Sequence, residues 1–170
     1  MKFFKYGSYV LRHKFWVAYY CFKAGIPLRG LLHDSSKLLP SEWQPYANYF
    51  YGPKGDENRK IRKEQGGYYK PYSTGDEKFD FAWLLHQKRN SHHWQWYVLP
   101  KDDGGLHVLP MKRKDWKESI CDWRGAGRAQ GYGDNTIKWY KANGSKMTLH
   151  PDTRAKIEKE LKKIFNVETL

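Results

Sequence analysis

The sequence predicts an all-α fold, a single-domain helical bundle over residues 1–170 with one small β-hairpin near residues 98–109. Apolar residues recur at three- and four-residue spacing along most of the chain, as they do on the buried face of a helix. The exception is a pair of short apolar runs, 98–99 and 106–109, on either side of an Asp-Gly turn signal, which is the pattern of a hairpin. At 170 residues the chain can bury one core without disulfides.

The spacing of apolar residues and the positions of glycine and proline predict the first three helices. From Lys2 to Ala24 there is no proline, and the apolar stripe of this expected helix includes His13. Gly25 is placed to end it, and Pro27 to begin a second helix that reaches His33. Pro40 and Ser41 open a third helix through Phe50, with Ser41 as the candidate N-cap.

Residues 52–75 are rich in glycine, proline and basic side chains, and they predict a basic loop insertion with a short helix at 57–65. Two interpretations stay open for it, a solvated surface and a basic lid over an anionic substrate. Further helices are expected at 76–90, 114–125, from 134–135 to 142, and at 151–165, the last with His150 as its cap. The glycine-rich segment 125–133 follows a helix, so it is no Rossmann or Walker loop, although Arg128 could approach an anion there.

Composition limits the partners. The formal net charge of +13 predicts attraction to phosphates on nucleotides, nucleic acid or anionic lipid. No run of 18 apolar residues occurs, so we expect no membrane span. Arg12, His13 and Lys14 interrupt the N-terminal apolar stretch that an export signal would need, so we expect a cytoplasmic protein. Two cysteines, Cys21 and Cys121, are too few for a disulfide framework and are expected to be buried free thiols.

The segment from Gly30 to Lys37 contains the most informative motif. An apolar run ends there in His33 and Asp34, and Lys37 follows three positions later. Adjacent side chains leave a helix about 100° apart, so the two can converge on one cation only where the backbone turns at a helix end. Imidazole and carboxylate are both good ligands for divalent metals, and Lys37 could reach a phosphate as a point charge. A helix C-terminus with a surface aspartate is the alternative.

Other residues of the same chemistry are spread along the chain. His13 lies on an apolar helix face, His86 with His92 and His93 surrounds an expected helix break at 90–91, and Asp122 lies between Cys121 and Trp123. Each has a simpler interpretation, namely a hydrogen-bonded core histidine, a histidine-rich polar turn, or an aspartate that faces solvent. A helical bundle can nevertheless convert such separated residues into one inward-facing site. His107, on the hairpin, is expected to be exposed and not a ligand.

The order His, His-Asp, further His and late Asp resembles the HD superfamily of metal-dependent phosphohydrolases. Residues 33–37 are similar to its His-Asp-x-x-Lys variant, and residues 86–94 are also similar to an HD-like family found in phages and bacteria. The resemblance covers about Tyr9 to Trp123. It implies a bundle of HD type and, for a phage-encoded member, a location in the host cytoplasm.

The resemblance also implies roles for individual residues. His13, His33, Asp34 and Asp122 would hold one divalent cation, and Asp34 would bridge to a second held by His86 and by His92 or His93. The ions would be Mn, Fe, Mg, Ni or Zn. Lys37 and Arg89 would stabilise the anionic transition state, with Lys88 and Arg128 as further substrate-binding candidates. Single-metal nucleotidases of this kind often have a glutamate soon after His-Asp, whereas Glu42 is eight residues beyond Asp34. This departure shifts the expectation toward a binuclear enzyme.

Three functions are therefore compatible with the sequence. The first is a metal-dependent phosphohydrolase or phosphodiesterase that acts on a nucleotide, a cyclic nucleotide or a nucleic-acid phosphoester. The second is a nucleic-acid-binding protein whose histidines are structural, with steeply salt-dependent binding. The third is a catalytically silent scaffold that binds a nucleotide or a host protein.

Overall fold

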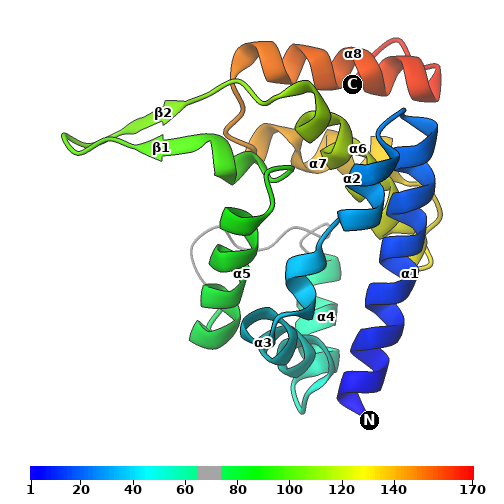
Figure 1. The fold of residues 1–170 in the computed structure, drawn as a ribbon, viewed down its shortest axis with the longest axis vertical. Helices are drawn as coiled ribbons and strands as arrows, with labels where there is room; N and C mark the ends of the chain where they lie inside the picture. Colours follow the sequence, from blue (N-terminus) through cyan, green and yellow to red (C-terminus); the bar gives the residue numbers. More distant parts are fainter. Residues whose placement is uncertain (65–73) are drawn as a thin grey trace.

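A computed structural model describes residues 1–64 and 74–170, and over these ranges the protein is all-α with one two-stranded antiparallel hairpin (Figure 1). The α-helices are α1 (Lys2–Lys23), α2 (Pro27–Leu32), α3 (Pro40–Tyr51), α4 (Gly55–Glu64), α5 (Glu77–Arg89), α6 (Arg113–Ala129), α7 (Thr136–Asn143) and α8 (Pro151–Phe165). Short 3₁₀ turns are η1 (Ser35–Leu38), η2 (Trp94–Tyr97) and η3 (Gly144–Lys146), and the hairpin pairs β1 (Val98–Pro100) with β2 (Leu106–Val108).

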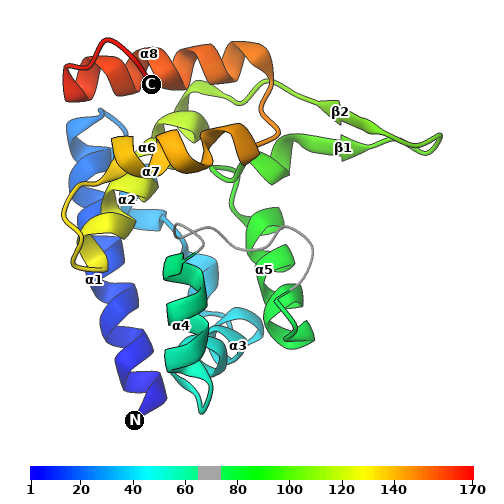
Figure 2. The same ribbon diagram turned by 180° about the vertical axis from the view of Figure 1, so that it is seen from behind.

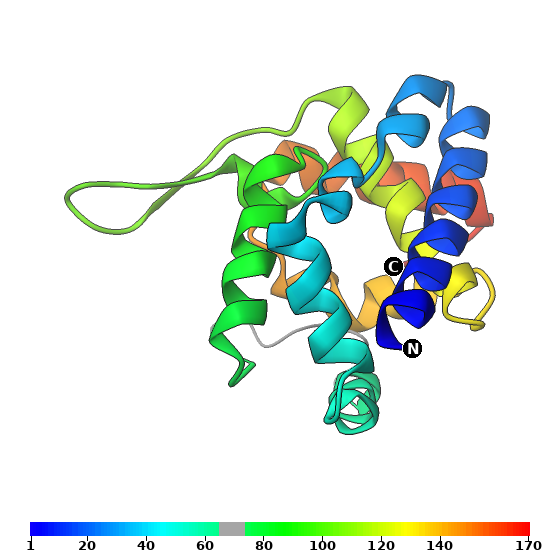
Figure 3. The same cartoon turned by 60° about the horizontal axis from the view of Figure 1, so that its bottom comes forward.

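Helix α1 is the central element of the packing. It lies against α2, α3 and α6, while α3 also packs on α5. Helix α8 crosses one end of the bundle beside α6 and α7, and the hairpin projects away from the helices (Figures 1 and 2). Seen from the N-terminal end, α1 and α6 form one side of the molecule, and α3 and α5 form the other (Figure 3). The functional candidates come from the elements that meet between these two sides.

The core consists of three clusters that meet around these elements. Aromatic residues dominate the cluster of α1, α3 and α5, which contains Tyr6, Val10, Tyr46, Ala47, Tyr49, Phe50, Phe79 and Ala82. A second cluster joins η2, α6, α7 and α8 through Tyr97, Met111, Trp116, Ile120, Tyr140, Ile157 and Leu161. A third joins α1, α2 and α6 through Val17, Tyr20, Cys21, Ile26 and Cys121. Both cysteines are buried and free, as predicted.

Most predicted elements are confirmed within a few residues, including the hairpin, the exposed His107 and the His150 cap, whose ring accepts from the backbone N–H of Asp152. Gly25 follows α1 with φ +74°, the left-handed conformation of a helix-ending glycine. The Ser41 cap is wrong. Leu39 holds the N-cap position of α3 without a side-chain bond, and the Ser41 hydroxyl accepts from Arg89 instead.

Helix α6 differs from the prediction at its C-terminal end. It continues to Ala129 through Gly125 and Gly127, where a glycine-rich loop was expected. Tertiary packing explains why two glycines remain helical, although each disfavours a helix by about 1 kcal/mol. A Cβ on Gly125 would lie 2.5 Å from Val17 Cγ2 and 3.0 Å from the Val17 backbone nitrogen, so the missing side chain lets α1 approach α6 closely.

The histidine-rich segment also differs. No second helix follows the break at residues 90–91, because α5 ends at Arg89 and a turn carries His92 and His93 into η2. In the region of the predicted basic loop, α4 occupies Gly55–Glu64, and residues 65–73 lie outside the described ranges, as does the lid interpretation that depends on them. In the described ranges, no helix has both the length and the hydrophobicity needed to cross a bilayer.

Candidate metal centre

The backbone turns sharply at the His-Asp motif. Helix α2 ends at Leu32, His33 is extended, and Asp34 adopts the left-handed conformation with φ 52° and ψ 27°. Aspartate is among the few non-glycine residues that tolerate this region. Lys14 supports the turn by donating from Nζ to the His33 carbonyl at 2.5 Å. Because of this turn the adjacent imidazole and carboxylate converge, as the sequence required for a shared cation.

One group of potential ligands joins α1, the α2–η1 turn and α6. It consists of His13, His33, Asp34 and Asp122, one ligand atom from each lying within 4.8 Å of the others. His13 Nε2 lies 3.1 Å from Asp122 Oδ1, 3.3 Å from His33 Nε2 and 3.5 Å from Asp34 Oδ2. Asp122 therefore faces the cluster, and the alternative in which it points to solvent is wrong; its side chain is 17% exposed.

A second group shares Asp34 with the first. It consists of Asp34, His86 from α5, and both His92 and His93 from the turn that follows. Asp34 Oδ1 lies 3.4 Å from His86 Nε2 and 3.4 Å from His92 Nε2, whereas Oδ2 faces the first group. The two oxygens of one carboxylate thus point toward two separate sets of nitrogen atoms.

Two glutamates hold the rings of three histidines. Glu118 Oε1 on α6 lies 2.8 Å from His33 Nδ1 and 3.3 Å from His92 Nδ1. Glu42 Oε2 on α3 lies 2.8 Å from His86 Nδ1. An ionised carboxylate can only accept, so each Nδ1 carries a proton, and in the neutral form of each ring, the form that binds metal, the Nε2 lone pair is directed into the cluster. Hydrogen bonding of this kind is typical of metal-binding histidines.

Arginines hold the two glutamates in turn. Arg29 donates from Nε to Glu118 Oε2 at 2.5 Å and also pairs with Asp115. Arg89 donates to Glu42 Oε1 at 2.8 Å. Both carboxylates are thereby fixed in a buried position, and so are the rings that they contact.

Burial and neighbouring charges shift the pKa values of several groups in the centre. Burial alone would raise the pKa of Asp34, but His33, Lys37 and His86 hold that pKa well below its usual range. Burial would lower the pKa of His33, yet Asp34, Asp122 and Glu118 raise it well above the ordinary value. Burial, followed by the neighbouring His92 and His86, lowers the pKa of His93 well below its usual range, which keeps this ring neutral, as ligation requires.

The donor set fits a divalent metal. Asp34 Oδ1, His92 Nε2 and His93 Nε2 are buried and have no hydrogen-bond partner among residues 1–64 and 74–170, which is costly for polar atoms. Ligand atoms about 2.1 Å from one cation lie roughly 3.0–3.5 Å from one another, and the distances within both groups match this. A mixture of imidazole and carboxylate suits Zn, Fe, Ni or Mn better than Ca. Buried His and Asp groups of this protein could therefore hold metal.

The comparisons place the chain in a family. The model of a family of unknown function, DUF5662, matches residues 2–163. The chain belongs to this family. No curated protein and no solved structure matches it. The matched range contains both ligand groups and the two glutamates, so the whole centre lies within the family's domain.

The remaining predicted site residues have different positions. Lys37 Nζ lies 2.6 Å from Asp34 Oδ2, inside the centre. Arg89 reaches it through Glu42. Lys88 donates to the backbone oxygen of Gln95, and Arg128 contacts the Tyr20 hydroxyl and the Trp16 ring, so neither makes a described contact with the ligand groups.

The sequence analysis missed Glu118, and it noted Glu42 only because it lies farther from the His-Asp pair than the glutamate of single-metal nucleotidases. One signal was present for Glu118. Asp115, Glu118 and Asp122 follow one another at spacings of three and four, so three acids share one face of α6, and all three are largely buried. No local pattern connects Glu42 to His86, because these two residues lie 44 positions apart in the sequence, on α3 and α5.

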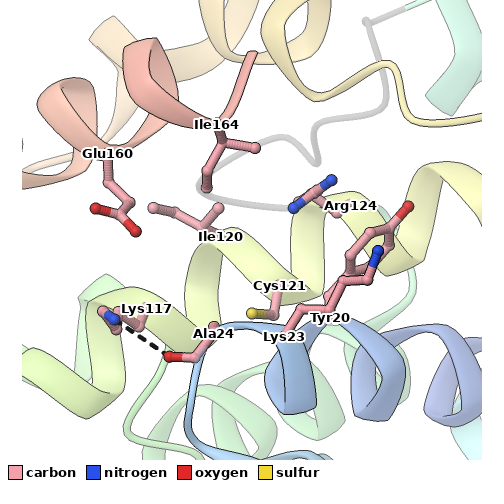
Figure 4. A pocket seen from close by; sticks show the side chains of 9 residues that line it. All are labelled: Tyr20, Lys23, Ala24, Lys117, Ile120, Cys121, Arg124, Glu160 and Ile164. Atoms are coloured by element: carbon pink, nitrogen blue, oxygen red, sulfur yellow. Dashed lines mark hydrogen bonds between the residues drawn. The ribbon is translucent and has the colours of Figure 1, made fainter. Parts of the chain in front are cut away.

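A pocket of about 230 Å³ lies on another face of α6, between α1 and α8 (Figure 4). Its basic side chains already have partners. Lys117 donates to the Ala24 carbonyl, and Arg124 donates to Asp134. Among the described residues, none that lines the pocket belongs to the ligand groups, so the pocket is separate from the candidate metal centre.

Proposed function

We propose that this protein is a divalent-metal-dependent hydrolase of phosphoesters, acting on a nucleotide, a cyclic nucleotide or a nucleic-acid phosphate. The observation that carries the proposal is the division of Asp34 between two ligand groups, with Oδ2 facing His13 and His33 and Oδ1 facing His86 and His92. A carboxylate between two sets of ligands is the arrangement of a two-metal site. The likeness to the HD superfamily supports the same reaction.

Two divalent ions at such a site, Mn, Fe, Ni, Zn or Mg, would supply Lewis acidity that activates water and neutralises charge on a phosphoryl oxygen. The chain's own residues have complementary tasks. Glu118 and Glu42 keep the histidine Nε2 lone pairs directed inward. Lys37 adds a fixed positive charge beside Asp34, where an anionic phosphoryl group would be attracted. The net charge of +13 would favour the approach of any phosphate.

The test uses purified protein with its metal content determined by elemental analysis. Phosphomonoesters, phosphodiesters, cyclic nucleotides and short oligonucleotides are assayed with each of the five metals. Asp34→Asn and His33→Ala are the test variants, since asparagine also tolerates the left-handed backbone at position 34. His107→Ala is the matched control, because that histidine is exposed on the hairpin.

We expect turnover that falls by roughly two orders of magnitude or more in both test variants and is unchanged in His107→Ala, with the same circular dichroism in all of them. Failure of the metal-loaded wild type to hydrolyse any of these substrates would refute the proposal. A protein without turnover that still binds oligonucleotides after chelation, with a steep salt dependence, would instead support the nucleic-acid-binding alternative that the charge of +13 favours.

A further inference from the structure

Large apolar side chains lie exposed along one side of α1. Phe4, Leu11, Phe15 and Phe22 are between 64% and 81% exposed. At 100° per residue their positions fall within about 40° of one another around the helix axis, so they form one straight stripe that runs nearly the whole length of α1. Such a continuous apolar stripe facing water is unusual for a helix of a soluble domain, whose apolar stripe normally faces the core.

Helix α2 extends this stripe sideways. A Cβ on Gly30 would lie 2.7 Å from Cys21 Cβ and 2.8 Å from Ala18 Cα, so α2 packs closely beside α1, as Figures 1 and 3 also show. Leu28 and Leu31, one helical turn apart on α2, are 72% and 65% exposed. We call these six residues, Phe4, Leu11, Phe15, Phe22, Leu28 and Leu31, the α1–α2 apolar face.

The area of this face matches one half of a stable protein interface. With roughly 150–200 Å² for a whole large apolar side chain, the exposed fractions leave on the order of 700 Å² of apolar surface in water. A standard interface buries about 800 Å² on each partner. Because an isologous dimer uses the same patch twice, one such face on each copy is sufficient.

Basic side chains border the face. Lys5, Arg12 and Lys23 are exposed on the flank of α1, about 90° around the helix from the centre of the stripe. Lys14 lies at the seam between the two helices, but its ammonium is bound to the carbonyls of Leu31 and His33. The stripe of α1 itself is apolar, and the other basic side chains form the rim of the face. The rim charges oppose the contact of two copies only weakly, because rim positions are hydrated and screened by salt.

We propose that the α1–α2 apolar face is a homodimer interface, through which two copies of the chain associate across a two-fold axis. This assignment is independent of the metal centre. It predicts self-association that high salt leaves intact or strengthens, because salt screens the repulsion between the basic rims and favours apolar burial. Binding to a polyanion or to an anionic bilayer would show the opposite salt dependence.

The experiment is sedimentation velocity of the full chain over a concentration series at low and high NaCl, with Phe15→Glu and Leu28→Glu as test variants. Phe81→Glu is the matched control, since Phe81 of α5 is 61% exposed but lies outside the face. All three substituted residues are exposed on the surface of a helix, and circular dichroism verifies that each variant folds.

We expect a species of twice the chain mass for the wild type and for Phe81→Glu at both salt concentrations. Each test variant should dissociate roughly 100-fold more readily, because two buried carboxylates are introduced per dimer. A monomeric wild type at every concentration would overturn the proposal, and so would test variants that associate as strongly as Phe81→Glu. Flotation with phosphatidylglycerol vesicles by a monomeric wild type would overturn it in favour of a lipid surface.

Discussion

Replacing Glu118 by glutamine tests whether one carboxylate supports both halves of the candidate metal centre. Glu118 Oε1 contacts His33 Nδ1 at 2.8 Å in the first group and His92 Nδ1 at 3.3 Å in the second, and Glu42 contacts only His86 of the second group. Glutamine has the shape of glutamate without its charge. Glu118→Gln should therefore weaken both metal sites, whereas Glu42→Gln should weaken only the second.

The magnitude follows from the contacts that are lost. Removing a carboxylate that orients a metal-binding histidine typically costs 10- to 100-fold in metal affinity, which is about 1.4–2.7 kcal/mol. For Glu118→Gln we expect a loss in this range at each site. The fold should persist, because Arg29 keeps its ion pair with Asp115.

Isothermal titration of the chelated protein with Zn²⁺ or Mn²⁺, together with elemental analysis after dialysis, measures both affinities and the stoichiometry. Wild type is expected to bind two ions, and Glu42→Gln to retain one tightly bound ion. If Glu118→Gln bound metal with wild-type affinity at both sites, or if Glu42→Gln weakened both sites equally, the assignment of the two glutamates would be wrong.

Three further predictions concern stability. Metal added to chelated wild type should raise the thermal midpoint, with about 2.7 kcal/mol gained at 100 times the dissociation constant, and differential scanning calorimetry should show no comparable gain in Asp34→Asn. The pKa of Glu118 is lowered to about 2, because the bonds from His33 and His92 outweigh burial, which would raise it. A carboxylate whose pKa is lower in the folded state than in the unfolded state stabilises the fold fully above the unfolded pKa, near 4.5, and this stabilisation is lost as the pH falls. Urea titrations of the metal-free proteins should therefore show that, between pH 5 and pH 2, the free energy of unfolding falls by about 3 kcal/mol more in the wild type than in Glu118→Gln. Gly125→Ala should lower the free energy of unfolding by about 1–3 kcal/mol, because its Cβ would overlap Val17; an unchanged urea midpoint would contradict the close packing of α1 on α6.

The helical content and the hairpin could be predicted because they depend on local patterns. The spacing of Val10, His13 and Val17 marks the buried face of α1, and the Asp-Gly turn marks the hairpin. The sequence predictions failed where a distant contact overrides a local preference. Gly125 and Gly127 remain in α6 because other segments pack against their missing side chains, and Ser41 does not cap α3 because its hydroxyl binds Arg89.

The candidate ligands were predictable as residue types and as an order along the chain, but their grouping was not. The side chains of His33 and Asp34 are metal ligands in any fold, and the turn at the end of α2 depends only on neighbouring residues. The sequence by itself therefore determined that these two side chains could bind one metal ion. Only the tertiary structure decided that Asp34 faces two ligand groups, that both His92 and His93 belong to the second, and that Glu118 joins the two. The physical reason is that these contacts join residues as far apart in the sequence as His33 and Glu118, which are separated by 85 positions. The packing of the helices, and not local propensity, decides which of their atoms meet.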